Sequence, residues 1–268
     1  MLLAQITDLH MRRDDTPLSG AVVTGPYIAA AVEAVNARRP DAVIVTGDLT
    51  DIGTAEEYRL VRTALDRLAA PYFVLPGNHD RREALREAFS DHAYLRESGY
   101  LDWVDGRFPL RLVGLDSVVA GASHGEITPD SLAWLHATLA ADMGPTVVAL
   151  HHPPFLTGIK GMDGIMCRNG EALAAVIARH SHVVRVIAGH HHRPVTVAWA
   201  GTIGQIAPSV AHQVHLDFSE REMAEWVLEP PAFLLHLWTG ETLISHTAYV
   251  EGYGGPQPFQ LDPDYPGA

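Results

Sequence analysis

Short apolar runs alternate with segments of helical periodicity along most of this chain, and this alternation constrains the fold more than any other feature. Six such runs cover residues 2–7, 42–46, 72–75, 111–115, 146–150 and 183–188. They are too short for helices and too continuously apolar for strands with one face in solvent. Strands buried on both faces, in a sheet covered by helices, have this composition. The sequence therefore predicts an α/β fold.

Four segments between these runs have the features of helices. Residues 26–39 repeat apolar side chains on one face. A capping-box pattern from Thr54 to Glu57 predicts the start of a second helix. Thr128, followed by a proline at the first helical position, predicts the start of a third helix, and a fourth is expected over about 171–180.

The pattern changes after Arg193. Apolar runs at 195–199, 214–218, 233–238 and 242–250 follow one another without helical segments between them, and from residue 252 the chain is rich in Gly and Pro. We expect a core domain over residues 1–193 and a β-rich C-terminal part over 194–268. That part is expected to complete a second sheet, to contribute subunit contacts and to end in an irregular tail.

Histidine is unusually frequent, with 16 copies in 268 residues, whereas Cys167 is the single cysteine. One cysteine excludes an intrachain disulfide and a site built from several thiolates. Any bound metal must therefore be held by imidazole and carboxylate groups. The lone cysteine, the lack of a signal-like leader and the lack of a long apolar segment predict a cytoplasmic protein without a membrane partner.

Five polar clusters directly follow five of the predicted strands. They are Asp8-Leu9-His10, Gly47-Asp48-Leu49-Thr50-Asp51, Gly77-Asn78-His79-Asp80, His151-His152-Pro153-Pro154 and Gly189-His190-His191-His192. Ligands of α/β sheets gather at the carboxyl ends of strands. One histidine on its own is usually an ordinary core or surface residue, but five acid and imidazole clusters at strand ends predict one metal site.

Counting the donors indicates two ions. The candidate ligands are Asp8, His10, Asp48, Asn78, His151, His190 and His192. One ion does not normally take seven such ligands, whereas two ions that share a bridging aspartate take four each. The set predicts a binuclear centre with ions roughly 3.5–4 Å apart. Its nitrogen and oxygen donors suit divalent or trivalent iron, manganese, zinc or cobalt better than calcium. We interpret Asp51 as a turn or cap residue.

In this order the clusters resemble the calcineurin-like metallophosphoesterase superfamily over residues 2 to about 193. The stretch from His151 through Met162-Asp163 and Asn169-Gly170, with Ala211-His212-Gln213-Val214 later, is similar to the bacterial glycerophosphodiesterases and cyclic-nucleotide phosphodiesterases of that superfamily. The resemblance implies a four-layer α/β/β/α sandwich with a β-rich C-terminal extension.

The resemblance also implies how the ligands divide. It assigns Asp8, His10 and His192 to one metal, Asn78, His151 and His190 to the other, and Asp48 to the bridge. None of these positions departs from the family pattern. The neighbours His152 and His191 are expected to be structural or to support the ligands.

The same resemblance implies the residues that meet substrate. His79 matches the family histidine that contacts the substrate phosphate, beside the ligand Asn78, and Asp80 is expected to orient it. We therefore expect His79 and Asp80 to act in catalysis. His212 is expected to be a second phosphate contact, and Asn78 is expected to contact substrate as well as metal.

Together these features predict a metal-dependent phosphodiesterase that hydrolyses small phosphodiesters, such as glycerophosphodiesters or cyclic nucleotides, by attack of a metal-bound hydroxide. The net charge of −13 disfavours long nucleic acids. Two alternatives remain open at this point: a phosphomonoesterase of the same fold and a non-catalytic scaffold that binds proteins. We also expect a homo-oligomer.

Overall fold

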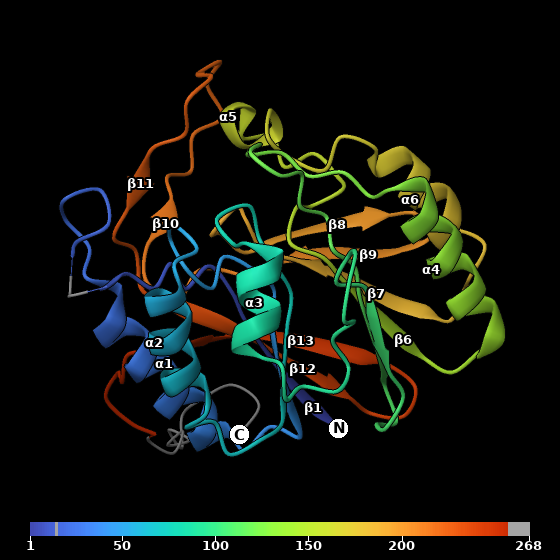
Figure 1. The fold of residues 1–268 in the computed structure, drawn as a ribbon, viewed down its shortest axis with the longest axis horizontal. Helices are drawn as coiled ribbons and strands as arrows, with labels where there is room; N and C mark the ends of the chain where they lie inside the picture. Colours follow the sequence, from blue (N-terminus) through green and yellow to red (C-terminus); the bar gives the residue numbers. More distant parts are fainter. Residues whose placement is uncertain (14–15, 257–268) are drawn as a thin grey trace, which may run out of the picture.

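Two mixed β-sheets lie face to face in the computed structural model, which describes residues 1–13 and 16–256 (Figure 1). The first sheet has the strand order β13-β12-β1-β2-β3. Its strands are β1 (Leu2–Ile6), β2 (Ala42–Val45), β3 (Tyr72–Val74), β12 (Ala232–Trp238) and β13 (Leu243–Tyr249). Strands β1, β2 and β3 are parallel, and β12 is antiparallel to β1.

The second sheet has the strand order β4-β5-β6-β7-β9-β8. Its strands are β4 (Trp103–Asp105), β5 (Arg111–Gly114), β6 (Thr146–Ala149), β7 (Val183–Ala188), β8 (Val195–Trp199) and β9 (Thr202–Ile206). A separate pair, β10 (Gln213–Val214) and β11 (Trp226–Val227), forms a small hairpin. Near it lies the short helix α5 (Lys160–Asp163), as Figure 1 shows.

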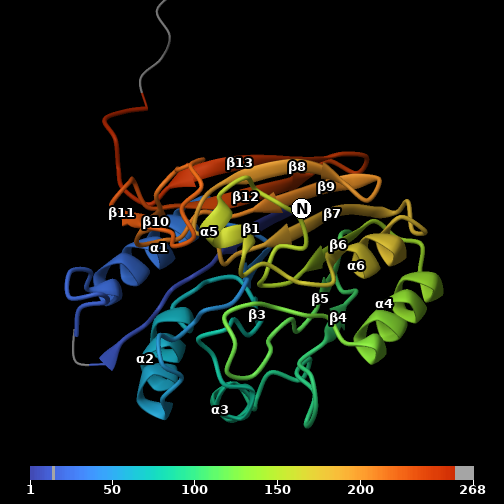
Figure 2. The same ribbon diagram turned by 90° about the horizontal axis from the view of Figure 1, so that it is seen from above.

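Helices cover the outer faces of both sheets (Figure 2). The first sheet carries α1 (Thr24–Arg38), α2 (Ala55–Leu65) and α3 (Arg82–Ala88), and the second carries α4 (Pro129–Ala141) and α6 (Gly170–Ile177). Successive side chains of a strand point to opposite faces of the sheet. Val43 and Val45 of β2 therefore pack with the helices, whereas Ile44 packs between the sheets. The fold is therefore the expected four-layer α/β/β/α sandwich.

The predicted helix starts are confirmed. Glu57 N donates to Thr54 Oγ1 and Thr54 N donates to Glu57 Oε2, which completes the capping box of α2. The Thr128 side chain caps α4 by accepting from Ser131 N. These contacts satisfy backbone donors that a helix start leaves without partners.

The C-terminal half departs from the prediction. The expected strand over 214–218 is wrong, because β10 ends at Val214 and pairs only with β11. Strand β9 was not predicted; it forms a hairpin with β8. We expected this part to complete the second sheet. Strands β8 and β9 lie at one edge of that sheet, whereas β12 and β13 extend the first sheet, because β12 pairs with β1.

Several short elements were also not predicted. They are β4, β11, α3 and α5, which have two to seven residues each and are too short to establish a periodic pattern. Residues 252–256 contain no helix or strand, and the rest of the tail that we expected to be irregular lies outside the described residues. Across the described chain, no helix combines the length and hydrophobicity needed to span a membrane.

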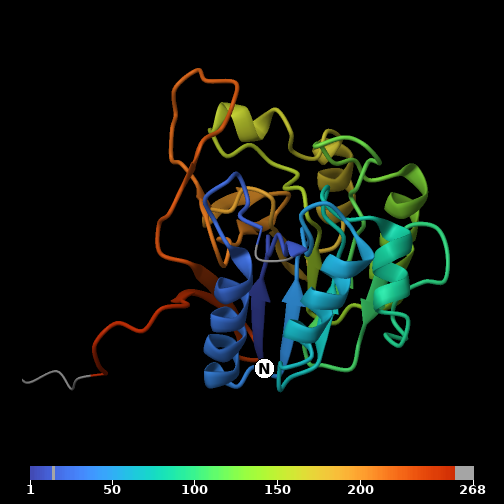
Figure 3. The ribbon, with the colours of Figure 1, turned by 60° about the vertical axis from the view of Figure 1, so that its left-hand side comes forward.

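The parallel strands of both sheets run in a common direction, with their carboxyl ends under the hairpin of β10 and β11 (Figure 3). Backbone hydrogen bonds join the loops at this end: Asp8 N donates to Gly47 O, and His10 N donates to Asp48 O. Within the second sheet Gly189 N donates to His151 O, and across the sheets His190 N donates to the Asp8 carboxylate. The loops that carry the five polar clusters are therefore held together.

Candidate metal centre

All seven predicted metal ligands converge at this end of the molecule. The loop after β1 carries Asp8 and His10, and the loops after β2, β3, β6 and β7 carry Asp48, Asn78, His151, and His190 with His192. Six of the seven side chains are buried, and Asn78 is half-buried. Carboxylates and imidazoles rarely gather in such a dry place without partners of opposite charge.

The backbone at these positions is strained. Five of the seven residues have a positive φ angle: Asp8 53°, His10 44°, Asp48 49°, His190 69° and His192 47°. Each such conformation costs an L-residue about 1–3 kcal/mol. Strain of this kind clusters at functional sites, where the surrounding structure enforces it. Here it turns the chain sharply at the strand ends and aims the side chains inward.

A first group of donors surrounds one point. His192 Nε2 lies 3.3 Å from Asp8 Oδ1 and 3.2 Å from His10 Nε2. Asp48 Oδ2 lies 3.6 Å from His10 Nε2. Ligand atoms about 2.0–2.1 Å from a metal ion are about 2.8–3.4 Å apart in tetrahedral or octahedral geometry. These spacings therefore fit, or nearly fit, the shell of one ion.

A second group lies on the other side of Asp48. His151 Nε2 lies 3.3 Å from Asp48 Oδ2 and 3.1 Å from Asn78 Oδ1. The His190 ring packs 5.0 Å from the His151 ring, centroid to centroid. The same oxygen of Asp48 thus faces both groups, which is the geometry of a bridging ligand.

The hydrogen bond that each imidazole makes with a backbone carbonyl shows which of its two nitrogens faces the centre. His151 Nδ1 lies 2.8 Å from Thr46 O, and His192 Nδ1 lies 3.2 Å from His212 O. His190 is reversed, with Nε2 3.1 Å from Ile165 O. A ring nitrogen beside a carbonyl must carry the proton, so the opposite nitrogen has a free lone pair. The lone pairs of His151, His192 and His190 therefore face inward, as metal coordination requires.

The electrostatics favour an ionised Asp48, a neutral His190 and a positively charged His151. Burial tends to raise the pKa of Asp48, but the imidazoles of His151 and His79 hold that pKa well below its usual value. Burial, followed by the proximity of His152 and His151, lowers the pKa of His190 well below 6.5. Burial opposes a charged His151, yet Asp48 raises the pKa of His151 to about 9. A positive charge is therefore most favourable beside Asp48.

His79 lies at the edge of the two groups. Its backbone N donates to Asp48 Oδ1 at 2.9 Å, and its ring stacks edge-on against His10 at 4.7 Å between centroids. His79 Nδ1 lies 2.7 Å from Asp51 O and 3.6 Å from Asp51 Oδ1. This contact makes Nδ1 the donor and leaves Nε2 free, with 39% of the side chain exposed.

We predicted that Asp80 orients His79, but the Asp80 carboxylate bonds to other groups. Its carboxylate accepts from Gly77 N, Leu49 N, Thr50 N, Thr50 Oγ1 and Tyr58 OH, and among the described residues it makes no hydrogen bond or ion pair with the His79 ring. Asp80 therefore joins the loops after β2 and β3. The residue beside the His79 ring is Asp51.

Asp51 is the functional candidate that sequence reasoning missed, because we interpreted it as a turn residue. Its Oδ1 lies 3.4 Å from His10 Nδ1, and its Oδ2 lies 3.1 Å from Arg12 Nη1. Asp51 thus contacts a candidate ligand and the predicted substrate histidine at once. Its spacing of three residues after Asp48 was the available signal, but the role depends on two other loops.

His212 lies within the same cluster. Its ring centroid is 4.6 Å from that of His192 and 5.6 Å from that of His10. Burial, followed by the proximity of His192 and His10, lowers the pKa of His212 to about 2. The imidazole is therefore neutral, and it can donate or accept one hydrogen bond at the centre.

The two histidines left out of the predicted ligand set are also buried. His152 Nδ1 lies 2.8 Å from Ser117 Oγ, and the His152 ring packs 4.6 Å from the His190 ring. Within the described residues, the ring nitrogens of His191 have no hydrogen-bond partner. His152 thus supports the second group by packing against His190.

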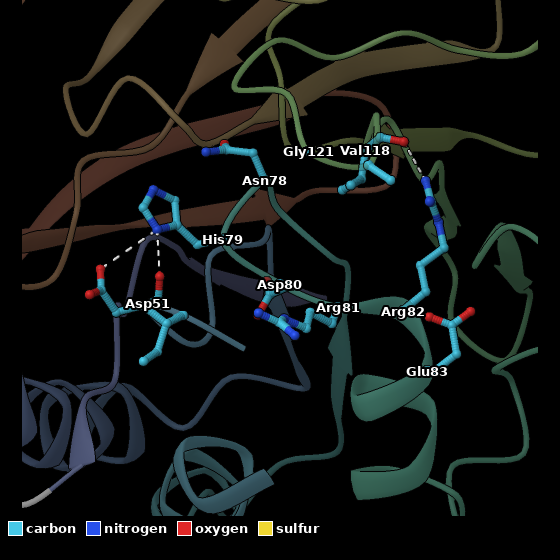
Figure 4. A pocket seen from close by; sticks show the side chains of 11 residues that line it. Asp51, Asn78, His79, Asp80, Arg81, Arg82, Glu83, Val118 and Gly121 are labelled. Carbon is cyan, nitrogen blue, oxygen red and sulfur yellow. Dashed lines mark hydrogen bonds and ion pairs between the residues drawn. The ribbon is translucent and has the colours of Figure 1, made fainter. Parts of the chain in front are cut away.

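A cavity of about 520 Å³ opens beside the centre (Figure 4). Asn78, His79 and Asp51 form the wall nearest the candidate ligands, and Arg82 and Val118 lie at the opposite end. A small organic ester fits a space of this size.

The sequence profile of the calcineurin-like phosphoesterase family matches residues 1–194. The chain is 36% identical over 264 residues to a probable glycerophosphodiester phosphodiesterase of Arcobacter nitrofigilis, with 97% of each chain covered. It is 30% identical over 214 residues to the 3′,5′-cyclic adenosine monophosphate phosphodiesterase of Escherichia coli K12, covering 79% of this chain and 76% of that one.

Solved structures show the same fold at low sequence identity. A dimetal phosphatase of Danio rerio has a TM-score of 0.63 at 14% identity, covering 94% of this chain and 99% of that chain. A purple acid phosphatase of yellow lupin has a TM-score of 0.69 at 12% identity, covering 93% of this chain and 51% of that chain.

Proposed function

Because this chain belongs to the calcineurin-like phosphoesterase family, we propose that it is a metal-dependent phosphodiesterase acting on small phosphodiesters. The observation that carries the proposal is the position of Asp48 Oδ2 between His10 Nε2, at 3.6 Å, and His151 Nε2, at 3.3 Å. One carboxylate oxygen facing two groups of donors suits two cations that share a ligand.

The residues divide between the two ions as follows. Asp8, His10 and His192 would hold the first ion, Asn78, His151 and His190 would hold the second, and Asp48 would bridge them. The nitrogen and oxygen donors favour iron, manganese, zinc or cobalt. When bound, such ions lower the pKa of a water molecule and neutralise charge on the phosphoryl oxygens.

The neighbouring histidines orient the ester. His79 Nε2 is free on the cavity side, because Asp51 O holds Nδ1. Burial lowers the pKa of His79, but Asp48 and Asp51 O raise it overall, so the protonated ring is favoured. From this position the protonated ring donates its Nε2 proton to a phosphoryl oxygen or to the departing alcohol oxygen. Asp51 holds the ring in that orientation, and His212 makes a second contact with the phosphate group. Asp80 supports the two loops without contacting substrate.

Small diesters are the substrate class that the site supports best. The cavity of about 520 Å³ holds one small alcohol residue, and the net charge of −13 repels long nucleic acids. The curated relatives named above carry the names of glycerophosphodiester and cyclic-nucleotide phosphodiesterases. Both classes remain candidates for this chain.

A comparison of two chromogenic esters tests the activity. Purified protein is loaded with manganese, iron, zinc or cobalt, and hydrolysis of bis(p-nitrophenyl) phosphate is compared with hydrolysis of p-nitrophenyl phosphate. We expect metal-dependent activity with a preference for the diester. A strong preference for the monoester would make the protein a phosphomonoesterase, and a lack of activity with every metal would favour a non-catalytic scaffold.

We also propose a homo-oligomer and a cytoplasmic location. Several large apolar side chains in and around the hairpin of β10 and β11 are exposed, namely Leu216, Phe218, Met223, Trp226 and Leu228. An exposed apolar surface of this kind suits a subunit contact. A single, buried cysteine suits a reducing compartment. Light scattering on the purified protein tests the oligomer, and a monomer at working concentration would contradict it.

A further inference from the structure

One arginine in the cavity beside His79 is unpaired. The Arg81 side chain is exposed, and its guanidinium makes no hydrogen bond or ion pair with any residue that the structure describes. Figure 4 shows Arg81 between the His79 end of the cavity and the Arg82 end. The guanidinium is therefore available to a molecule that enters the cavity.

The other charged groups of the cavity already have partners. Arg82 donates to both oxygens of Asp116. Asp51 pairs with Arg12 at 3.1 Å. A third pair is weaker: Glu83 Oε1 lies 4.0 Å from Arg86 Nη1 within α3, and the Glu83 side chain is 88% exposed. Of the two arginines of this cavity, Arg82 is paired and Arg81 has no partner among the described residues, so Arg81 is the guanidinium that can bind an anion.

Packing holds Arg81 in place. A Cβ atom built on Gly53 lies 2.7 Å from Arg81 Cγ and 3.1 Å from Arg81 Nε, so the arginine stem lies directly on the Gly53 backbone. Arg81 N donates to Tyr58 OH at 2.9 Å, and Tyr58 OH in turn donates to the buried Asp80. A side chain restrained in this way loses less entropy when it binds a ligand.

The surroundings of Arg81 are partly apolar. Ile52 is 44% exposed on the same side, and Val118, Ala120 and Gly121 contribute to the lining. A short carbon chain suits such a surface. The planar fork of arginine binds carboxylate and phosphate oxygens in pairs.

We propose that Arg81 determines specificity, and that this cavity accepts an alcohol residue of the diester that carries a second anionic group, a carboxylate or a phosphate. This inference rests on the proposed phosphodiesterase function. It narrows that function from small phosphodiesters in general to doubly charged ones. The guanidinium then binds the second anionic group while the phosphodiester lies at the metal centre.

Symmetric diesters test the proposal, because they place the same group on both sides of the phosphorus. Bis(2-carboxyethyl) phosphate and bis(2-phosphonoethyl) phosphate are compared with the neutral bis(2-carbamoylethyl) phosphate, and hydrolysis is followed by ³¹P NMR. We expect kcat/KM for at least one anionic probe to exceed that of the amide about tenfold, as a charge-assisted hydrogen bond allows. The faster of the two anionic probes identifies the preferred group.

The ratio of kcat/KM for the preferred anionic probe to kcat/KM for the amide probe is then measured in variants. Arg81→Gln is expected to bring the ratio close to one, and Arg81→Lys, which keeps the charge but loses the fork, to restore part of it. Arg59→Gln removes an exposed arginine of α2 and is the matched control, with an expected ratio equal to that of the parent. A ratio near one in the parent, or a preference that survives Arg81→Gln, would overturn the proposal. Failure of the parent to hydrolyse bis(p-nitrophenyl) phosphate would instead contradict the proposed function.

Discussion

His10 Nε2 and His192 Nε2 face each other at 3.2 Å, although the other nitrogen of each ring lies beside an acceptor. His192 Nδ1 is held by His212 O, and His10 Nδ1 lies 3.4 Å from Asp51 Oδ1. Two lone pairs at this distance repel unless a cation lies between them. Burial lowers the pKa of His10, so a proton is held poorly there. A metal ion fits the position better.

Removal of metal is therefore expected to destabilise the protein. A ligand that binds only the folded state at a hundred times its Kd adds about 2.7 kcal/mol of stability. For a chain of this size we expect Tm to fall by about 5 °C or more after chelation. Thermal unfolding before and after dialysis against EDTA, followed by readdition of manganese or zinc, measures the effect. An unchanged Tm would contradict metal binding at this centre.

Replacement of Asp48 is expected to affect both ions at once. Because one oxygen of Asp48 faces both donor groups, Asp48→Ala should lower the metal content from about two ions per chain to below one. Diesterase activity should fall by about a hundredfold or more. Metal analysis together with bis(p-nitrophenyl) phosphate hydrolysis checks this prediction. Asp130→Ala, an exposed carboxylate of α4, is the control, and a variant that keeps two ions and full turnover would rule out the bridge.

Asp51 and Asp80 are expected to have different roles. Asp80→Ala leaves buried amides of Leu49, Thr50 and Gly77 without an acceptor, and should lower the free energy of unfolding by about 2–5 kcal/mol. Asp51→Ala keeps the backbone carbonyl beside His79 Nδ1 but removes the carboxylate, which lies 3.6 Å from that nitrogen and 3.4 Å from His10 Nδ1, and should lower kcat about tenfold to a hundredfold.

Urea unfolding and steady-state kinetics on both variants separate these effects. An Asp80 variant of unchanged stability would contradict its structural role. If Asp51→Ala kept the parent kcat, the Asp51 carboxylate would not be needed beside His79 and His10.

His236 is expected to make stability depend on pH. Burial, followed by the charge of Arg185, lowers the pKa of His236 to about 3 from its ordinary value of 6.5. Between these values the unfolded chain binds the proton and the folded chain does not. The contribution of His236 to stability is therefore complete above pH 6.5 and is lost as the pH falls toward 3, by about 1.4 kcal/mol per pH unit.

Urea unfolding at pH 7.5 and pH 5 tests this. His236→Gln should reduce the loss of unfolding free energy between pH 7.5 and pH 5 by about 2 kcal/mol. Gln can still reach toward Ser245 and Gln5, the hydrogen-bond partners of His236. An equal loss in parent and variant would show that other groups cause the pH dependence.

Much of the centre was predictable because its residues follow strands. The apolar runs predicted β1, β2, β3, β5, β6 and β7, and the carboxyl ends of parallel strands meet at one edge of a sheet. Thr54 and Thr128 predicted the starts of α2 and α4, because a helix cap depends only on residues close in sequence. Elements that lack a local pattern, such as β4 and α3, were not predicted.

The sequence by itself determined the kinds of donor, their order along the chain and the alternation that makes the layers. Only the tertiary structure decided which oxygen of Asp48 faces both groups, which nitrogen of each histidine points inward, and that Asp51 rather than Asp80 lies beside His79. It also decided that β12 pairs with β1. These features depend on hydrogen bonds and packing between loops far apart in sequence, and spacing along the chain carries no information about them.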